Sequence, residues 1–142
     1  MKPLLYLITL LLFTSISRSE EQFDSEHPVI AGVYELIGRQ AETGTLMTGT
    51  VTITETKPNV FTVTREINGK TIIGTGKVDR ATPDSIPVFR VQFSDQGKQI
   101  EGTFLWQSDL DNYGRLSGYV YPKGYHGAKP GLEALFHKNA AE

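Results

Sequence analysis

Tyrosine and charged side chains gather in the last third of the chain, between residues 109 and 126. Tyrosine combines a large, stiff contact area with a polar tip, which is why binding surfaces are rich in it. We therefore predict a surface here that binds a small molecule, a glycan or a protein. The alternative is that the rings cover hydrophobic gaps and brace long loops. The predicted binding residues of this segment are Tyr113, Arg115, Tyr119 and Tyr121.

Arg65 is a further candidate, because it shares the parity of Phe61, Val63 and Ile67 in one alternating segment. If those apolar residues point inward, the arginine does too. An inward arginine needs a carboxylate, several carbonyl groups or a place at the mouth of a barrel. We interpret Arg65 as a residue that could hold an acidic ligand. A bracing ion pair, or an exit to solvent at the end of the strand, is the alternative.

Signatures of catalysis and of metal binding are weak. The three histidines, His27, His126 and His137, lack the spacing of metal ligands, and no nucleophile-elbow glycine pattern surrounds a serine. The available acid–base pair is His126 with Asp109 or Asp111, provided that their loops meet. The sequence therefore favours a non-enzymatic protein without a cofactor or a metal site. A hydrolase or isomerase that uses His126 with a loop carboxylate is the alternative, and a structural envelope protein is another.

The elements that would position these residues are β-strands. Apolar and polar residues alternate with period two from Val29 to Lys138, with turn signals about every 8–12 residues. Asn68-Gly69 is the strongest hairpin signal among them. Inward glycines let the strands of a small barrel approach closely, and they recur at positions 49, 74, 76, 102 and 118. We predict an all-β fold, a single antiparallel up-and-down barrel of about eight short strands. A sandwich is the alternative.

Threonine occupies every second position from Thr48 to Thr56 and alternates with an apolar set. Because a one-residue shift in register would turn that apolar set outward, the threonines must face water. A flat array that binds a lattice would need the row repeated on neighbouring strands, and Thr62 and Thr64 continue it for one strand before it stops. We therefore interpret the row as the wet side of a strand.

The last segment, residues 132–138, fits a closing strand or a short helix. We favour a strand with Leu132, Ala134 and Phe136 inward, because it would cover the exposed edge of the first strand. In such a meander, successive connections alternate between the two ends of the barrel. One end then carries residues 41–44, 68–69, 95–98 and 123–131, and the other carries 57–59, 79–87 and 109–114. Since this separates Tyr113 from Tyr125, the outer face of the seventh strand becomes the predicted contact surface.

This outline resembles the calycin group, the lipocalins and avidin-like proteins. The segment Gly32-Val33-Tyr34 is similar to the lipocalin Gly-x-Trp motif, with tyrosine in place of tryptophan. The chain departs from the pattern in having no cysteine and no recognisable basic closing motif. The resemblance implies an eight-stranded exported barrel that binds a small ligand in its mouth.

The N-terminal segment has the layout of a secretory signal peptide over residues 1–19, with Lys2 before an apolar run from Leu4 to Phe13. This run is shorter than the roughly 20 residues that span a bilayer. We predict a mobile acidic leader at 20–28, the barrel domain at 29–138 and a tail at 139–142. The mature chain would be secreted or periplasmic, with no integral membrane span. It would hold twelve cations against sixteen acids, which disfavours nucleic acid as a partner.

Overall fold

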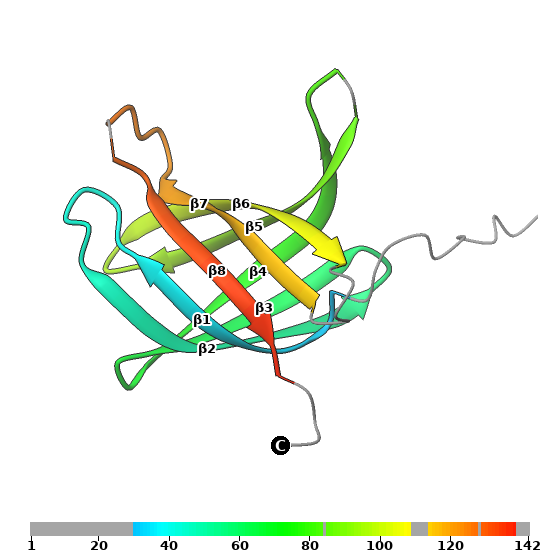
Figure 1. The fold of residues 1–142 in the computed structure, drawn as a ribbon, viewed down its shortest axis with the longest axis horizontal. Coiled ribbons are helices and arrows are strands. Elements are labelled where there is room, and N and C mark those ends of the chain that lie inside the picture. Colours follow the sequence, from blue (N-terminus) through cyan, green and yellow to red (C-terminus); the bar gives the residue numbers. More distant parts are fainter. Residues whose placement is uncertain (1–29, 84, 109–113, 128, 139–142) are drawn as a thin grey trace, which may run out of the picture.

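The computed structural model describes residues 30–83, 85–108, 114–127 and 129–138. These residues form a closed antiparallel barrel in which each strand pairs with the next one along the chain (Figure 1). The strands are β1 (Gly32–Arg39), β2 (Leu46–Lys57), β3 (Val60–Ile67), β4 (Lys70–Ala81), β5 (Ile86–Asp95), β6 (Lys98–Ser108), β7 (Gly114–Pro122) and β8 (Gly131–His137). The predicted signal peptide, acidic leader and tail lie outside the described residues.

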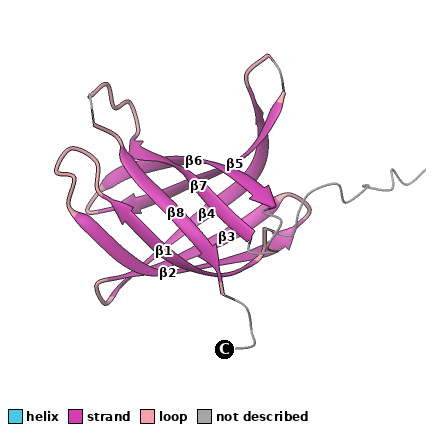
Figure 2. Cartoon of the chain, in the orientation of Figure 1, coloured by secondary structure: helices cyan, strands magenta, loops and turns pink. Residues whose placement is uncertain are grey.

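The predicted up-and-down barrel is confirmed. β1 pairs with β8, from Tyr34 opposite His137 to Arg39 opposite Leu132, and this pairing closes the sheet. The segment at 132–138 is therefore a closing strand and not a helix. Strands and loops alone make up the described residues (Figure 2), so none of these residues forms a helix that could cross a membrane.

The barrel interior holds the predicted core. Phe61, Val63, Phe89, Val91, Phe104 and Val120 are all buried in one cluster. The inward glycines explain how the strands come so close. A Cβ on Gly118 would collide with the carbonyl oxygen of Thr103, and one on Gly49 with that of Glu66. The side chain of Trp106, which shares the inward parity of Phe104, lies outside the described set.

The threonine row faces outward, as predicted, while Val51 and Ile53 between its members are buried. Thr54 pairs with Thr62 on β3, and Thr62 pairs with Thr75 on β4. Ile73 lies opposite Thr64, however, so the threonine row is interrupted on β4.

The predicted inward face of β8 is wrong. Gly131, Glu133 and Leu135 are buried, whereas Phe136 is 38 % exposed. The alternation in this strand is the reverse of the one that its apolar residues suggested. The physical reason lies across the barrel, where the inward Arg65 takes Glu133 as its partner.

The two ends of the barrel differ. One end is packed: the Tyr34 hydroxyl donates a hydrogen bond to the Ile30 carbonyl oxygen (2.7 Å), and its ring meets that of His137 edge-on at 5.1 Å. The other end, at the left of Figure 1, carries the β1–β2, β3–β4, β5–β6 and β7–β8 connections. The predicted grouping of these four connections is confirmed by the meander topology.

Candidate binding site

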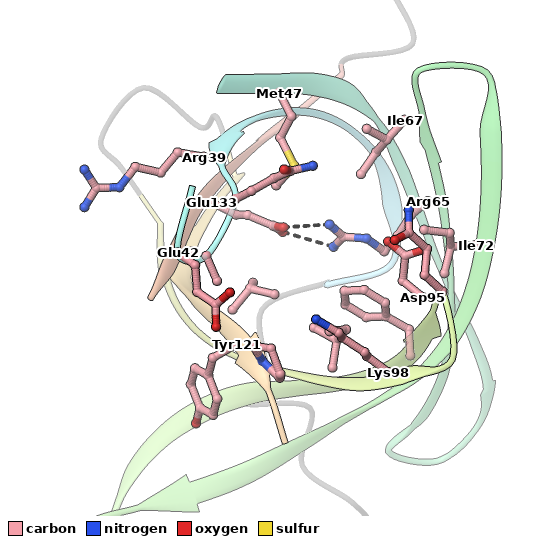
Figure 3. Close-up of a pocket in the computed structure, with 18 of the residues that line it drawn as sticks. Arg39, Glu42, Met47, Arg65, Ile67, Ile72, Asp95, Lys98, Tyr121 and Glu133 are labelled. Carbon is pink, nitrogen blue, oxygen red and sulfur yellow. Dashed lines mark hydrogen bonds and ion pairs between the residues drawn. The ribbon is translucent and has the colours of Figure 1, made fainter. Parts of the chain in front are cut away.

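A cavity of about 470 Å³ opens at the end that carries these four connections; we call it the mouth cavity. Figure 3 shows side chains of several strands converging on it. Its apolar wall comes from inward positions near the strand ends, where the core cluster gives way to open space. The wall residues are Met47, Ile67, Ile72, Phe93, Ile100 and Val120.

The base of the mouth cavity is a buried ion pair between Arg65 of β3 and Glu133 of β8, which we call the Arg65–Glu133 bridge. The two side chains point toward one another across the barrel (Figure 3). The arginine Nη1 and Nη2 donate to Oε2 and Oε1 of the glutamate at 3.0 and 2.6 Å. Only 2 % of Arg65 and 4 % of Glu133 is exposed. A bidentate pair is the strongest ion-pair geometry. Two buried charges need such geometry to offset the free energy lost when they leave water.

Neighbouring residues hold the bridge in place. The guanidinium lies over the ring of Phe93, with Cζ 4.4 Å from the ring centre, a cation–π arrangement. Gly38 of β1, paired with Glu133, leaves room for the carboxylate stem, because a Cβ there would lie 3.1 Å from the Glu133 Cγ. The buried Nε of Arg65 has no hydrogen-bond partner among the described residues.

The rim of the mouth cavity is charged and exposed. Lys70 and Asp95 form an ion pair there, and Arg39, Glu42 and Lys98 complete the charged set. The backbone N–H of Glu42 donates to the carbonyl oxygen of Lys129 (2.9 Å), which ties the β1–β2 connection to the β7–β8 connection. A backbone hydrogen bond thus links two of the four connections at the rim.

The predicted tyrosine surface is only partly assembled. Tyr119 is 55 % exposed on the outer face of β7, as expected because Leu116 and Val120, which have the opposite parity, are buried. Tyr121 is half-buried at the edge of the mouth cavity, and in Figure 3 its ring points away from the bridge. Arg115 has the same parity as Tyr119 in β7; it is half-buried and makes contacts of its own. Tyr113 lies outside the described residues.

Tyr125 fits the alternative interpretation of the tyrosines, in which the rings brace loops. Its hydroxyl donates to the carbonyl oxygen of Lys129 (3.0 Å) and accepts from the N–H of the same residue (3.2 Å). The Tyr125 hydroxyl thus joins two parts of the β7–β8 connection.

The proposed acid–base pair draws no support from the topology. His126 is exposed in the β7–β8 connection. Asp109 and Asp111 lie outside the described residues, in the connection between β6 and β7. Since β7 runs from Gly114 to Pro122, these two connections leave it from opposite ends.

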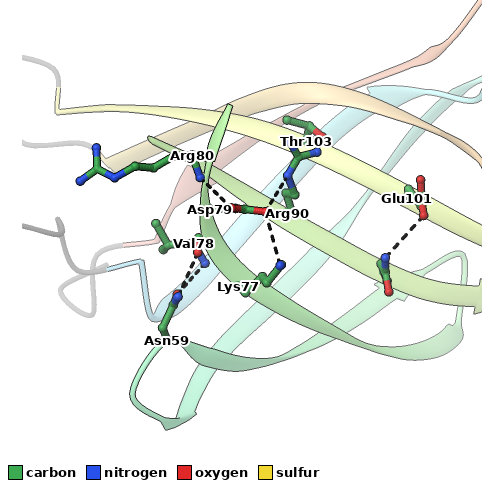
Figure 4. Close-up of polar contacts among 9 residues, drawn as sticks. Asn59, Lys77, Val78, Asp79, Arg80, Arg90, Glu101 and Thr103 are labelled. Atoms are coloured by element: carbon green, nitrogen blue, oxygen red, sulfur yellow. Dashed lines mark hydrogen bonds and ion pairs between the residues drawn. The ribbon is translucent and has the colours of Figure 1, made fainter. Parts of the chain in front are cut away.

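Two other polar groups with shifted pKa values lie away from the mouth cavity. Burial raises the pKa of the Tyr34 hydroxyl to about 12. On the outer face of β4, the backbone N–H of Arg80 donates to Asp79 (2.8 Å), and Lys77 and Arg90 approach the same carboxylate (Figure 4). The hydrogen bond from this N–H, followed by that from Lys77, lowers the pKa of Asp79. The side chains of Lys77, Asp79 and Arg90 are all well exposed, so the ion pairs among them contribute little to stability.

Sequence reasoning missed Glu133 and the residues that line the cavity above it. A carboxylate was one of the predicted partners of an inward Arg65, and Glu133 shares the parity of Gly131 and Leu135 in the closing strand. These two facts together could have located the bridge. The apolar triad Leu132, Ala134 and Phe136 was the stronger local pattern, and it pointed to the wrong face.

Comparison with known proteins supports the fold. No protein-family model and no curated protein sequence matches this chain. Among solved structures, it is similar to a redesigned β-barrel at TM-score 0.50 and 17 % identity, covering 77 % of this chain and 91 % of that one. It is also similar to the redesigned barrel mFAP0 bound to DFHBI, at TM-score 0.51 and 16 % identity, covering 78 % and 100 %. These likenesses show a small eight-stranded antiparallel barrel.

Proposed function

We propose that this protein is a non-enzymatic binder of a small molecule, which it takes into the mouth cavity. The observation that carries the proposal is the Arg65–Glu133 bridge at the base of a cavity with an apolar wall. Ligand pockets typically measure about 300–1,000 Å³ and combine apolar walls with a few placed polar groups, and this cavity fits that description. A purely structural envelope role would not require such a cavity.

The calycin resemblance supports the same proposal, because lipocalins and avidin-like proteins bind ligands in the mouths of exported barrels. The likeness to mFAP0, whose structure holds DFHBI, agrees with the ability of a barrel of this size to take a small molecule. Export of this chain through its N-terminal segment is part of the proposal.

Mass spectrometry of small molecules that co-purify with the protein from its native host would identify the ligand. The matched variants are Ile67→Trp, which fills the mouth cavity, and Ile73→Trp, which adds the same ring to the outer face, where Ile73 is 67 % exposed. We expect the first to lose the co-purifying molecule and the second to retain it. Equal retention by both folded variants would contradict binding in the mouth cavity.

A second candidate function is capture of a protein partner or a glycan by the outer face of β7. It is favoured by Tyr119, which is 55 % exposed and pairs with Leu132, and by the exposed Leu105 and Phe136 on the adjacent strands. Replacing Tyr119 by serine should leave folding intact, because its ring is largely in solvent. Pull-down from the native host with Tyr119→Ser and wild type would test it, and equal capture by the two proteins would exclude this surface.

A further inference from the structure

We infer that the mouth cavity selects an uncharged ligand, with an apolar body and a neutral hydrogen-bonding group at its inner end. This inference rests on the proposed function and specifies the ligand class. It replaces the expectation that Arg65 would hold an acidic ligand.

The charge at the base of the mouth cavity is already matched. Both Nη atoms of Arg65 bond to the Glu133 carboxylate, so the positive charge has its counter-ion within 3.0 Å. A ligand carboxylate could take that place only by displacing Glu133, whose side chain is 1 % exposed. The displaced carboxylate would then be a buried, unpaired charge, which is strongly unfavourable. A ligand ammonium group is also unfavourable, because it would place a second, uncompensated positive charge beside the buried guanidinium of Arg65.

A neutral group faces no such penalty. The bridge uses two of the five N–H groups of the guanidinium, so the remaining N–H groups of its Nη atoms are not used by Glu133. The carboxylate oxygens also keep lone pairs beyond those used in the bridge. A hydroxyl, carbonyl or amide group can therefore bond to the bridge without breaking it. The apolar body would contact Met47, Ile67, Ile72 and Ile100 above it.

Charges at the rim do not change this preference. Lys70 is paired with Asp95, and Arg39, Glu42 and Lys98 are all exposed. Exposed charges act through water and salt, which weaken them. The Arg65–Glu133 bridge therefore determines which ligand charge the mouth cavity accepts.

The test uses the wild-type protein with Nile red as a neutral fluorescent reporter and three competitors of equal chain length: 1-octanol, octanoate and octylammonium at pH 7.5. We expect 1-octanol to displace the reporter at a concentration at least about tenfold lower than either ion, which corresponds to roughly 1.4 kcal/mol. Octanoate or octylammonium binding as tightly as 1-octanol would overturn the inference while leaving the proposed function standing. Failure of Nile red and all three competitors to bind would instead overturn the proposed function.

Apolar ligands partition into any apolar cavity, so a charge variant separates the bridge from simple hydrophobicity. In Glu133→Gln the charge of Arg65 is no longer compensated, and we expect octanoate to gain at least about tenfold in affinity relative to 1-octanol. Glu101→Gln, on the outer face of β6, removes the same charge and should leave the ratio unchanged. A folded Glu133→Gln protein with the wild-type ratio would overturn the inference.

A double variant provides a second route that does not depend on the folding of Glu133→Gln. Arg65→Met with Glu133→Leu replaces the bridge by apolar groups of similar size, which buried ion pairs commonly tolerate. Loss of the polar partner should weaken 1-octanol binding at least about fivefold. Unchanged 1-octanol binding would show that the bridge does not contact the ligand, and the inference would fail.

Discussion

Breaking the Arg65–Glu133 bridge from one side leaves the other charge inside the barrel. For Arg65→Met or Glu133→Leu alone we expect the free energy of unfolding to fall by about 3–5 kcal/mol. The double variant should recover most of that loss, because it buries no charge. Urea denaturation of the four proteins, followed by circular dichroism, measures these differences.

Lys70→Ala provides the contrast, since Lys70 and Asp95 are paired at the exposed rim, where loss of an ion pair costs about 0–1 kcal/mol. If each single variant at the bridge were as mild as Lys70→Ala, the bridge would not be buried in solution as it is in the structure.

Tyr34 makes stability depend on alkaline pH. Burial raises the pKa of its hydroxyl to about 12, whereas an unfolded tyrosine titrates near about 10. Above pH 10 the unfolded chain therefore loses this proton before the folded chain does, and the free energy of unfolding should fall as the pH rises toward 12. Urea denaturation between pH 9 and 12 would measure the decline.

Tyr34→Phe is the matched control for that pH series. It removes the titrating group together with the hydrogen bond to the Ile30 carbonyl oxygen, so it should be less stable at pH 9 but show a shallower decline. A decline of equal steepness in Tyr34→Phe and wild type would assign the alkaline loss to other groups.

At the scale of the strand, the inward glycines set how closely neighbouring strands can lie. A Cβ on Gly118 would collide with the Thr103 carbonyl oxygen and approach Phe104 Cα at 2.8 Å. We expect Gly118→Ala to lower the melting temperature, with a loss of at least about 1–3 kcal/mol, because backbone atoms have little room to move. Ser117→Ala on the outer face of the same strand should be nearly neutral. Equal melting temperatures for the two variants would contradict this close approach.

Most of the strands could be predicted because their apolar sets alternate without a competing pattern. In β3, the alternating Phe61 and Val63 are compatible with only one register. The Asn68-Gly69 turn then determines where the next strand begins. β8 carries a conflict instead, since Leu132, Ala134 and Phe136 are apolar while the buried face holds Gly131, Glu133 and Leu135. Its orientation depends on Arg65, which is 68 positions away in sequence. A local pattern cannot contain that information.

The calycin resemblance implied a ligand site in the mouth of the barrel, but the residues that line the mouth cavity could not be predicted, for a related reason. Its wall comes from β2 to β7 and its base from β3 and β8, so it exists only once the sheet has closed. Arg65 was correctly predicted to point inward, and the loops around the cavity were correctly assigned to one end. What was missing was the identity of its partner. Tyr119 and Tyr121 drew attention instead to the outside of the barrel.

At the scale of the whole molecule, we expect the chain to be exported and shortened. Mass spectrometry of the protein from a bacterial periplasm should show loss of the first 17 or 19 residues, where small side chains precede the cut. Leu10→Arg interrupts the apolar run and should leave the full-length chain in the cytoplasm. An unprocessed wild-type chain in the cytoplasmic fraction would contradict export.

The pairing of β1 with β8 also has a consequence for how the protein folds. β8 lies about a hundred residues after β1 in the sequence, so one edge of β1 stays unpaired until β8 joins the sheet. The carboxylate for Arg65 arrives on the same late strand. Closure of the barrel and neutralisation of its interior charge therefore occur in one step, when β8 pairs with β1, and the long ring closure that this step requires is expected to be the slow step of folding.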